Sequence, residues 1–170
     1  MSALPVRPVG PITPYLWFDG QAEEAAEFYV SLFAESGVDE VSRYSEAGRE
    51  VHGREPGSAM TVHFRLAGQP FIALNGGPQF PFTEAVSFMV TCETQAELDA
   101  LWDRLTEGGD PDAQQCGWCK DRFGVSWQVV PAALWRYLGN PDPGRAARAT
   151  QAMLRMKRLD LAELERAAAG

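Results

Sequence analysis

Two cysteines, Cys116 and Cys119, have the spacing in this sequence that most directly suggests chemistry. They stand in the stretch QQCGWCKDRFGVSWQVVP. A pair separated by two residues can form a redox disulfide or supply half of a zinc site. A redox pair usually starts a helix, whose dipole lowers the thiol pKa. Here a Lys-Asp turn and a strand are predicted instead, and only Cys92 remains as a further thiol. The sequence therefore favours an incidental pair, with the two side chains on opposite faces of a strand.

The two histidines do not replace the cysteines as a metal site. His52 lies in a predicted polar loop, and His63 alternates with Thr61 and Arg65 on a predicted strand. A metal ligand needs partners close by. His63 is therefore predicted to face solvent or to line a pocket.

Composition limits the classes of function. The 170 residues and the net charge of −8 fit one domain, or two small subdomains that share a core. The acidic balance argues against nucleic-acid binding, which needs clustered Lys and Arg. We expect no membrane segment, since no stretch approaches about 20 apolar residues, and the first residues lack the apolar core of a signal peptide. Three cysteines are too few for a disulfide scaffold, so a cytoplasmic protein with reduced thiols is expected.

The chain repeats one plan twice: a strand, a helix, a glycine and then further strands. The first copy has the strand ITPYLWF and the helix DGQAEEAAEFYVSLFAESG, which Asp19 or Gly20 could cap. The second copy has the strand SFMVTC and the helix ETQAELDALWDRLTEGG. Residues 15–37 and 87–109 align without a gap, which indicates an internal duplication.

The segments after each helix read as strands. GVDEVSRYSE is one strand, and SAMTVHFRLAGQPFIALNGG is a hairpin that turns at residues 67–70. In the second copy two strands turn at residues 120–124, and the absence of long helices between these strands predicts mostly antiparallel pairing. Beyond Pro131 the sequence is helical, with Asp160 and Glu163 as a capping box for the last helix.

Four segments resemble one known family, and together they cover most of the chain from Ile12 onward. They are ITPYLWFDGQAEEAAEFY, LNGGPQFPFTEAVSFMVTCETQAELDALW, GGDPDAQQCGWCKDRFGVSWQVVP and MLRMKRLDLAELERA. The sequence resembles the PhnB-like branch, often labelled 3-demethylubiquinone-9 3-methyltransferase domain, of the vicinal oxygen chelate superfamily. That superfamily includes glyoxalase I, bleomycin-resistance proteins and extradiol dioxygenases. Cys119 stands where the family pattern usually has an apolar residue.

The resemblance implies an α+β fold in which duplicated βαβββ units form a curved, mostly antiparallel sheet. The expected units span about residues 12–77 and 86–131 of a paired domain at 12–131. A flexible leader at 1–11 and a C-terminal helical extension at 132–170 complete the chain. The superfamily also leads us to expect a homodimer with pockets near the interface.

Metal-dependent members of the superfamily place four His or Glu ligands around a divalent ion, which polarises a substrate oxygen or activates O₂. Carried over to this chain, the ligand positions are Thr13, Pro14 or Tyr15, Ile72 or Ala73, Val86 or Ser87, and Gln128. Only Gln128 could coordinate, and a lone neutral amide binds divalent cations poorly. No metal residues and no cofactor are therefore predicted, and the usual divalent metal site is disfavoured.

The methyltransferase label finds little support in the residues. A conventional adenosylmethionine domain has a parallel doubly wound sheet with a Gly-rich turn after its first strand. This chain has FDGQAEEA there, with two glutamates that would repel an anion. LNGGP is Gly-rich, but a loop and a strand follow it.

A curved sheet implies a pocket with aromatic walls and a few polar groups. The candidate lining residues are Trp17, Asn75, Phe82, Glu84, Ser87, Trp118, Ser126 and Gln128. Glu84 is the only carboxylate in the apolar stretch FPFTEAVS and is the candidate general base, unless it solvates a linker. Asn75 and Gln128 could donate to a substrate carbonyl. The tryptophans could instead be core or interface aromatics.

The leading hypothesis is a small-molecule-binding protein without the usual metal, whose ligand the sequence does not name. The alternative is an enzyme that acts on a small oxygenated substrate in a glyoxalase-like, dioxygenase-like or ubiquinone-methylating reaction. A third hypothesis is a dimerisation module that packs the apolar side chains of AMLRMKRLDLAELERA against a partner.

Overall fold

The computed structural model describes residues 10–170, which form two compact units. The first unit ends at Pro81, and the second runs from Phe82 to Gly170. Most of the leader predicted at 1–11 lies outside the described residues. No helix within residues 10–170 is both long enough and apolar enough to cross a membrane.

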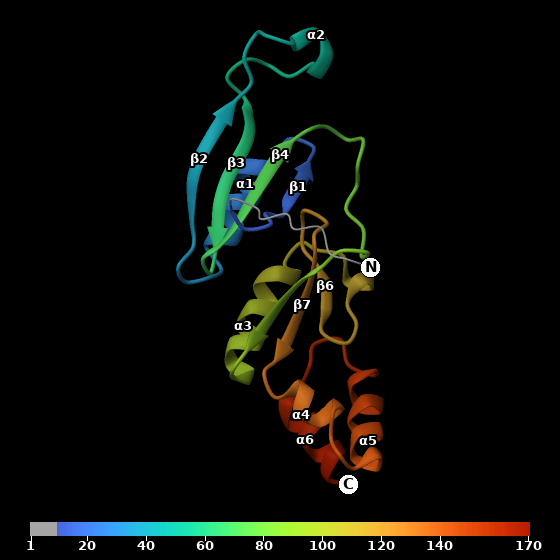
Figure 1. Ribbon diagram of the computed structural model, residues 1–170. Helices are drawn as coiled ribbons and strands as arrows, with labels where there is room; N and C mark the ends of the chain where they lie inside the picture. Colours follow the sequence, from blue (N-terminus) through green and yellow to red (C-terminus); the bar gives the residue numbers. More distant parts are fainter. Residues whose placement is uncertain (1–9) are drawn as a thin grey trace, which may run out of the picture. The chain divides into compact units, whose positions relative to one another are not determined.

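The first unit is a four-stranded sheet with a helix on one face (Figure 1). The sheet order is β1-β4-β3-β2, with β1 parallel to β4 and the other pairs antiparallel. The predicted hairpin is confirmed, because β3 and β4 are joined by a turn at residues 67–68. The elements are β1 (Tyr15–Phe18), α1 (Ala22–Val30), β2 (Gly37–Arg43), α2 (Arg49–His52), β3 (Ala59–Leu66) and β4 (Gln69–Asn75).

The core of the first unit lies between α1 and the sheet. Tyr29 of α1 is fully buried, and its ring stacks on Phe64 at 6.3 Å between centroids, while Phe64 stacks on Phe71 at 5.4 Å. Side chains alternate along a strand, so Trp17, His63 and Ile72 lie on the other face, where they are half-buried. We call this the open face of the first unit.

The cap predicted for the first helix is wrong. Neither Asp19 nor Gly20 caps α1, which begins at Ala22. The backbone N–H of Ala22 donates a hydrogen bond to the Oδ1 of Asn75 at 2.9 Å. The helix also ends at Val30, before the predicted end near Gly37. A side chain from β4 thus satisfies a helix-terminal N–H that has no intrahelical partner.

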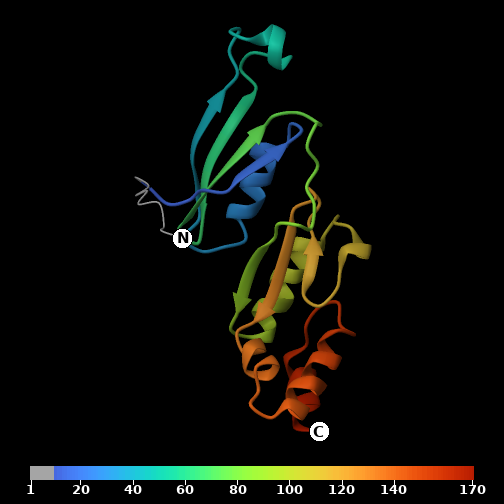
Figure 2. The same ribbon diagram turned by 45° about the vertical axis from the view of Figure 1, so that its right-hand side comes forward.

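The second unit repeats the plan of the first, which confirms the predicted α+β duplication (Figure 2). Its sheet has the order β5-β7-β6, with β5 parallel to β7 as β1 is to β4, and α3 packs against β7. It has three strands, because a 3₁₀ helix and a turn stand where the first unit has β2. The elements are β5 (Phe88–Cys92), α3 (Gln95–Thr106), η1 (Pro111–Ala113), β6 (Trp118–Lys120) and β7 (Ser126–Pro131).

The helical extension is confirmed as α4 (Leu134–Leu138), α5 (Pro143–Met153) and α6 (Leu161–Ala169). Asp160 caps α6 and accepts a hydrogen bond from the backbone N–H of Glu163 at 2.8 Å. The connection between α5 and α6 is fixed to the second unit. There, Gln95 of α3 donates to the carbonyl of Leu159 at 3.0 Å and accepts from the N–H of Leu161 at 2.8 Å.

Candidate functional site

The cysteine pair has the environment of unreactive thiols. Cys116 lies in a turn at φ +53°, and β6 begins only at Trp118, so the prediction that one strand carries both cysteines is wrong. Both thiols are free. Burial, and then the nearby carboxylate of Asp121, raise the pKa of Cys119 to about 12, and burial also raises the pKa of Cys116. Both are protonated at neutral pH, whereas thiol chemistry and metal ligation need thiolates.

Asp121 organises the turn between β6 and β7. Its side chain is 2% exposed and accepts hydrogen bonds from the backbone N–H groups of Phe123 at 2.8 Å and Val125 at 3.0 Å. Its other oxygen accepts from the indole N–H of Trp127 at 2.8 Å. Sequence reasoning read Asp121 only as a turn residue. The aspartate in a Lys-Asp turn followed by glycine was the available signal for this role.

The described residues do not fit the superfamily's metal site. Thr13, Tyr15 and Ile72 supply no imidazole or carboxylate, and the amide nitrogen of Gln128 donates to the hydroxyl of Ser87 at 2.9 Å. Elsewhere in residues 10–170, no three His, Cys, Asp or Glu side chains come close enough to hold a metal ion. At the positions carried over from the superfamily, the described residues therefore do not supply its His and Glu ligands.

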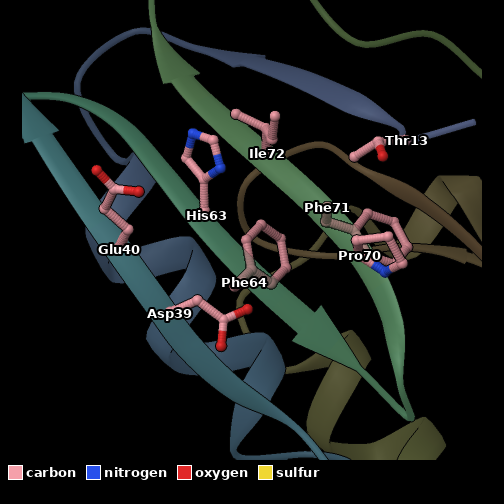
Figure 3. Close-up of a pocket in the computed structure, with 8 residues that line it drawn as sticks. All are labelled: Thr13, Asp39, Glu40, His63, Phe64, Pro70, Phe71 and Ile72. Atoms are coloured by element: carbon pink, nitrogen blue, oxygen red, sulfur yellow. The ribbon is translucent and has the colours of Figure 1, made fainter. Parts of the chain in front are cut away.

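A pocket of about 270 Å³ opens on the open face of the first unit (Figure 3). His63 stands at its centre on β3, directly opposite Glu40 of β2 on one side and Ile72 of β4 on the other. Directly opposed residues on neighbouring strands project from the same face. The lining residues are Thr13, Asp39, Glu40, His63, Phe64, Pro70, Phe71 and Ile72.

The polar groups of this pocket differ in their pairing. Asp39 accepts two hydrogen bonds from Arg65, from Nη2 at 2.7 Å and from Nε at 2.9 Å, and this lowers the pKa of Asp39. The side chains of Glu40 and His63 form no hydrogen bond or ion pair with any described residue, although the charge of His63 contributes to lowering the pKa of Asp39. The pocket therefore offers an imidazole and a carboxylate to a ligand. His63 lines a pocket, one of the two positions predicted for it.

The second unit brings five of the eight predicted site residues together on one sheet face. Trp118 of β6 lies opposite Gln128 of β7, and Lys120 lies opposite Ser126. Ser87 bonds to Gln128, as described above. We call this the open face of the second unit; Cys119 and Trp127 lie on the other side of the same strands.

Glu84 joins this face through an ion pair. Its carboxylate lies 2.5 Å from the ammonium of Lys120, with 60% of the Glu84 side chain and 19% of the Lys120 side chain exposed. Hydrogen bonding to Lys120 is the largest of the causes that lower the pKa of Glu84. Glu84 is therefore ionised at neutral pH and is a weaker base than an ordinary glutamate. Its catalytic role stays a prediction.

Ser126 lies beside Lys120 with an unused hydroxyl. The residue is 2% exposed, and its Oγ has no hydrogen-bond partner among the described residues. The large majority of buried polar side-chain atoms have one. This hydroxyl is an unsatisfied group on the open face of the second unit.

The remaining predicted site residues have contacts of their own. Asn75 uses both ends of its amide, since its Nδ2 also donates to the carbonyl of Ala59 at 3.0 Å. Trp17 donates to the carbonyl of Gly77 at 2.7 Å and meets the ring of Phe80 edge-on at 5.0 Å. Phe82 lies beside Gly124 in the second unit. Trp17 and Asn75 belong to the first unit, and the residues gathered around Lys120 belong to the second.

Comparisons with known proteins agree with this architecture. The family model described as 3-demethylubiquinone-9 3-methyltransferase matches residues 10–130. The PhnB protein from Bacillus cereus is 38% identical with a TM-score of 0.62, over 72% of this chain and 100% of that one. Protein PA1353 from Pseudomonas aeruginosa is 23% identical with a TM-score of 0.52, over 71% of this chain and 96% of that one. Among curated proteins, none matches the chain. The chain therefore belongs to the 3-demethylubiquinone-9 3-methyltransferase family, which is also the family in the description of the PhnB protein.

Proposed function

We propose that this protein binds a small organic molecule in the pocket around His63. The observation that carries the proposal is that His63 and Glu40 lie opposite each other in a pocket of about 270 Å³. The imidazole and the carboxylate form no side-chain hydrogen bond or ion pair with a described residue. Ligand sites combine apolar walls with a few polar groups that fix orientation. Ile72 and Pro70 supply the apolar wall here.

The polar groups favour a ligand that donates hydrogen bonds. Glu40 accepts hydrogen bonds, and the two ring nitrogens of His63 can donate or accept them. The Asp39–Arg65 pair has no net charge, so Glu40 makes the pocket negative. A hydroxylated or amino compound with a short apolar part fits these groups, and its binding needs no metal.

The family's description names a methyl transfer, but the turn between β1 and α1 does not offer the binding groups that an adenosine cofactor needs. A bound adenosine cofactor would need free N–H groups there. The N–H of Ala22 is taken by Asn75, and Asp19 beside it pairs with Arg54 at 3.1 Å. The ligand-binding proposal therefore does not include methyl transfer.

A fragment screen by ligand-observed NMR tests the proposal. We expect small hydroxylated or amino compounds to bind, and we expect His63→Ala and Glu40→Gln each to weaken them at least tenfold. Glu50→Gln is the matched control, because Glu50 is exposed in α2 and does not line the pocket. Zinc, nickel, manganese or iron added to chelator-treated protein should leave the affinities unchanged. Hits that bind His63→Ala and Glu40→Gln as well as the native chain would refute the proposal.

A further inference from the structure

The buried hydroxyl of Ser126 is the starting point for a second site, on the open face of the second unit. Its nearest neighbours on that face are Lys120, directly across on β6, and Gln128, two residues further along β7. Ser126 is 2% exposed, and its hydroxyl lacks the hydrogen-bond partner that the large majority of buried polar atoms have. The neighbours indicate what that partner is.

The groups around Ser126 are mainly hydrogen-bond donors and include a cation. Lys120 carries three ammonium N–H bonds on a side chain that is only 19% exposed. The Ser126 hydroxyl can donate, and Gln128 brings an amide that already donates one hydrogen bond to Ser87. One positive charge with neighbouring donors matches one carboxylate group.

The chain itself already places a carboxylate at this position. Glu84 reaches Lys120 from the segment that precedes β5, outside any strand or helix. Because 60% of the Glu84 side chain is in solvent, the pair buries only part of it, and Glu84 can leave Lys120. An exposed ion pair of this kind is weak, and a better-placed ligand carboxylate can replace it.

We propose that the open face of the second unit binds the carboxylate of a small organic acid through Lys120 and Ser126. Glu84 competes with that ligand for Lys120. This site is independent of the pocket around His63, since it shares no residue with that pocket and takes a ligand of the opposite charge. It gives Glu84 the role of an internal competitor in place of a general base.

Titration with acetate, butyrate and benzoate tests this site, with ¹⁵N NMR of the native chain as the readout at the Ser126 amide. Acetamide and benzamide are the neutral controls and should not bind. Lys120→Met should weaken carboxylate binding at least tenfold and Ser126→Ala about threefold or more. Glu84→Gln should strengthen binding severalfold, because it removes the competing carboxylate.

Matched variants separate the site from bulk charge and from misfolding. Lys157→Met makes the same charge change as Lys120→Met, and Glu165→Gln makes the same change as Glu84→Gln; both controls alter exposed residues of the extension. Thermal unfolding of each variant establishes that it is folded. Glu84→Gln is expected to bind carboxylates more tightly than the native chain. Misfolding would weaken binding, so it cannot produce this result.

Several results would overturn the inference. One is the absence of carboxylate binding to both the native chain and Glu84→Gln at 10 mM; another is loss of binding in Glu84→Gln. Equal effects of Lys120→Met and Lys157→Met would also exclude the site. His63→Ala should leave carboxylate binding unchanged, so this site and the pocket around His63 succeed or fail separately.

Discussion

At the residue scale, two residues of the same type differ in what they can bind, because their neighbours differ in whether they pair with them. Glu40 and Glu84 are both exposed glutamates, yet Glu40 is unpaired in a pocket and Glu84 is bound to Lys120. Asn75, a candidate for substrate binding by its type and place in the sequence, holds the start of α1 and the carbonyl of Ala59 together. An amide with both ends satisfied has no spare hydrogen-bonding group to give a ligand's carbonyl.

The Glu84–Lys120 pair gives a prediction about pH. The pair favours the ionised carboxylate, so the pKa of Glu84 in the native chain should lie below the ordinary value of 4.5. In Lys120→Met that pKa should rise toward the ordinary value, as measured by ¹³C NMR titration of the side-chain carboxyl.

The sign of the linked stability effect follows from the same shift. A carboxylate whose pKa is lowered by folding stabilises the native state above its unfolded pKa, and this contribution is lost as the pH falls through the folded pKa. An unchanged Glu84 pKa in Lys120→Met would show that the ion pair is absent in solution.

At the element scale, the connection between α5 and α6 bonds to the chain just before β6. In the first unit, the equivalent strand β3 pairs with the edge strand β2. The N–H groups of Cys116 and Gly117 donate to the carbonyls of Met156 and Lys157, each at 2.8 Å. Leu159 is fully buried and lies beside Gly117. Leu159 of the extension is therefore part of the second unit's core.

Two leucines of this extension form a matched pair for testing that statement. Leu159→Ala removes a fully buried side chain and should lower the free energy of unfolding by about 2–5 kcal/mol. Leu154→Ala changes a side chain that is 53% exposed and should alter it by no more than about 0.5 kcal/mol. Urea denaturation followed by circular dichroism measures both. Equal effects would mean that the extension does not pack as described.

Gly109 makes a close backbone contact that the sequence alone does not predict. The sequence predicts Gly109 as the glycine that ends the second helix. In the structure α3 ends at Thr106, three residues earlier. A Cβ at this position would lie 2.1 Å from the carbonyl oxygen of Lys120, so the backbone of β6 leaves no room for a side chain. Gly37 has open space around it and ordinary backbone angles. Of these two equivalent glycines, only Gly109 is therefore required by a close backbone contact.

At the scale of the whole molecule, the superfamily resemblance leads us to expect a homodimer. The extension exposes Trp135 at 58% and Leu154 at 53%, although Leu134, Leu159 and Leu164 are buried. We predict that the protein sediments at twice the mass of one chain at micromolar concentration. Sedimentation as a single chain would contradict the expectation without affecting either proposed site, because each lies within one unit.

The sequence by itself determined the α+β class, the duplication, the hairpins and the helical extension. Their signals are local: periodicity, glycine and proline positions, and a cap such as Asp160. It also placed Ser87, Trp118, Ser126 and Gln128 in one candidate site with four other residues, on the expectation that a pocket combines aromatic walls with a few polar groups.

Only the tertiary structure decided what those residues touch. The cap of α1 comes from Asn75, 53 residues away along the chain, and the pocket around His63 depends on the register that sets Glu40 and Ile72 beside it. The orphaned hydroxyl of Ser126 and the ion pair of Glu84 likewise follow from how strands and connections meet. Contacts between distant segments depend on chain topology and register, which local sequence patterns do not encode.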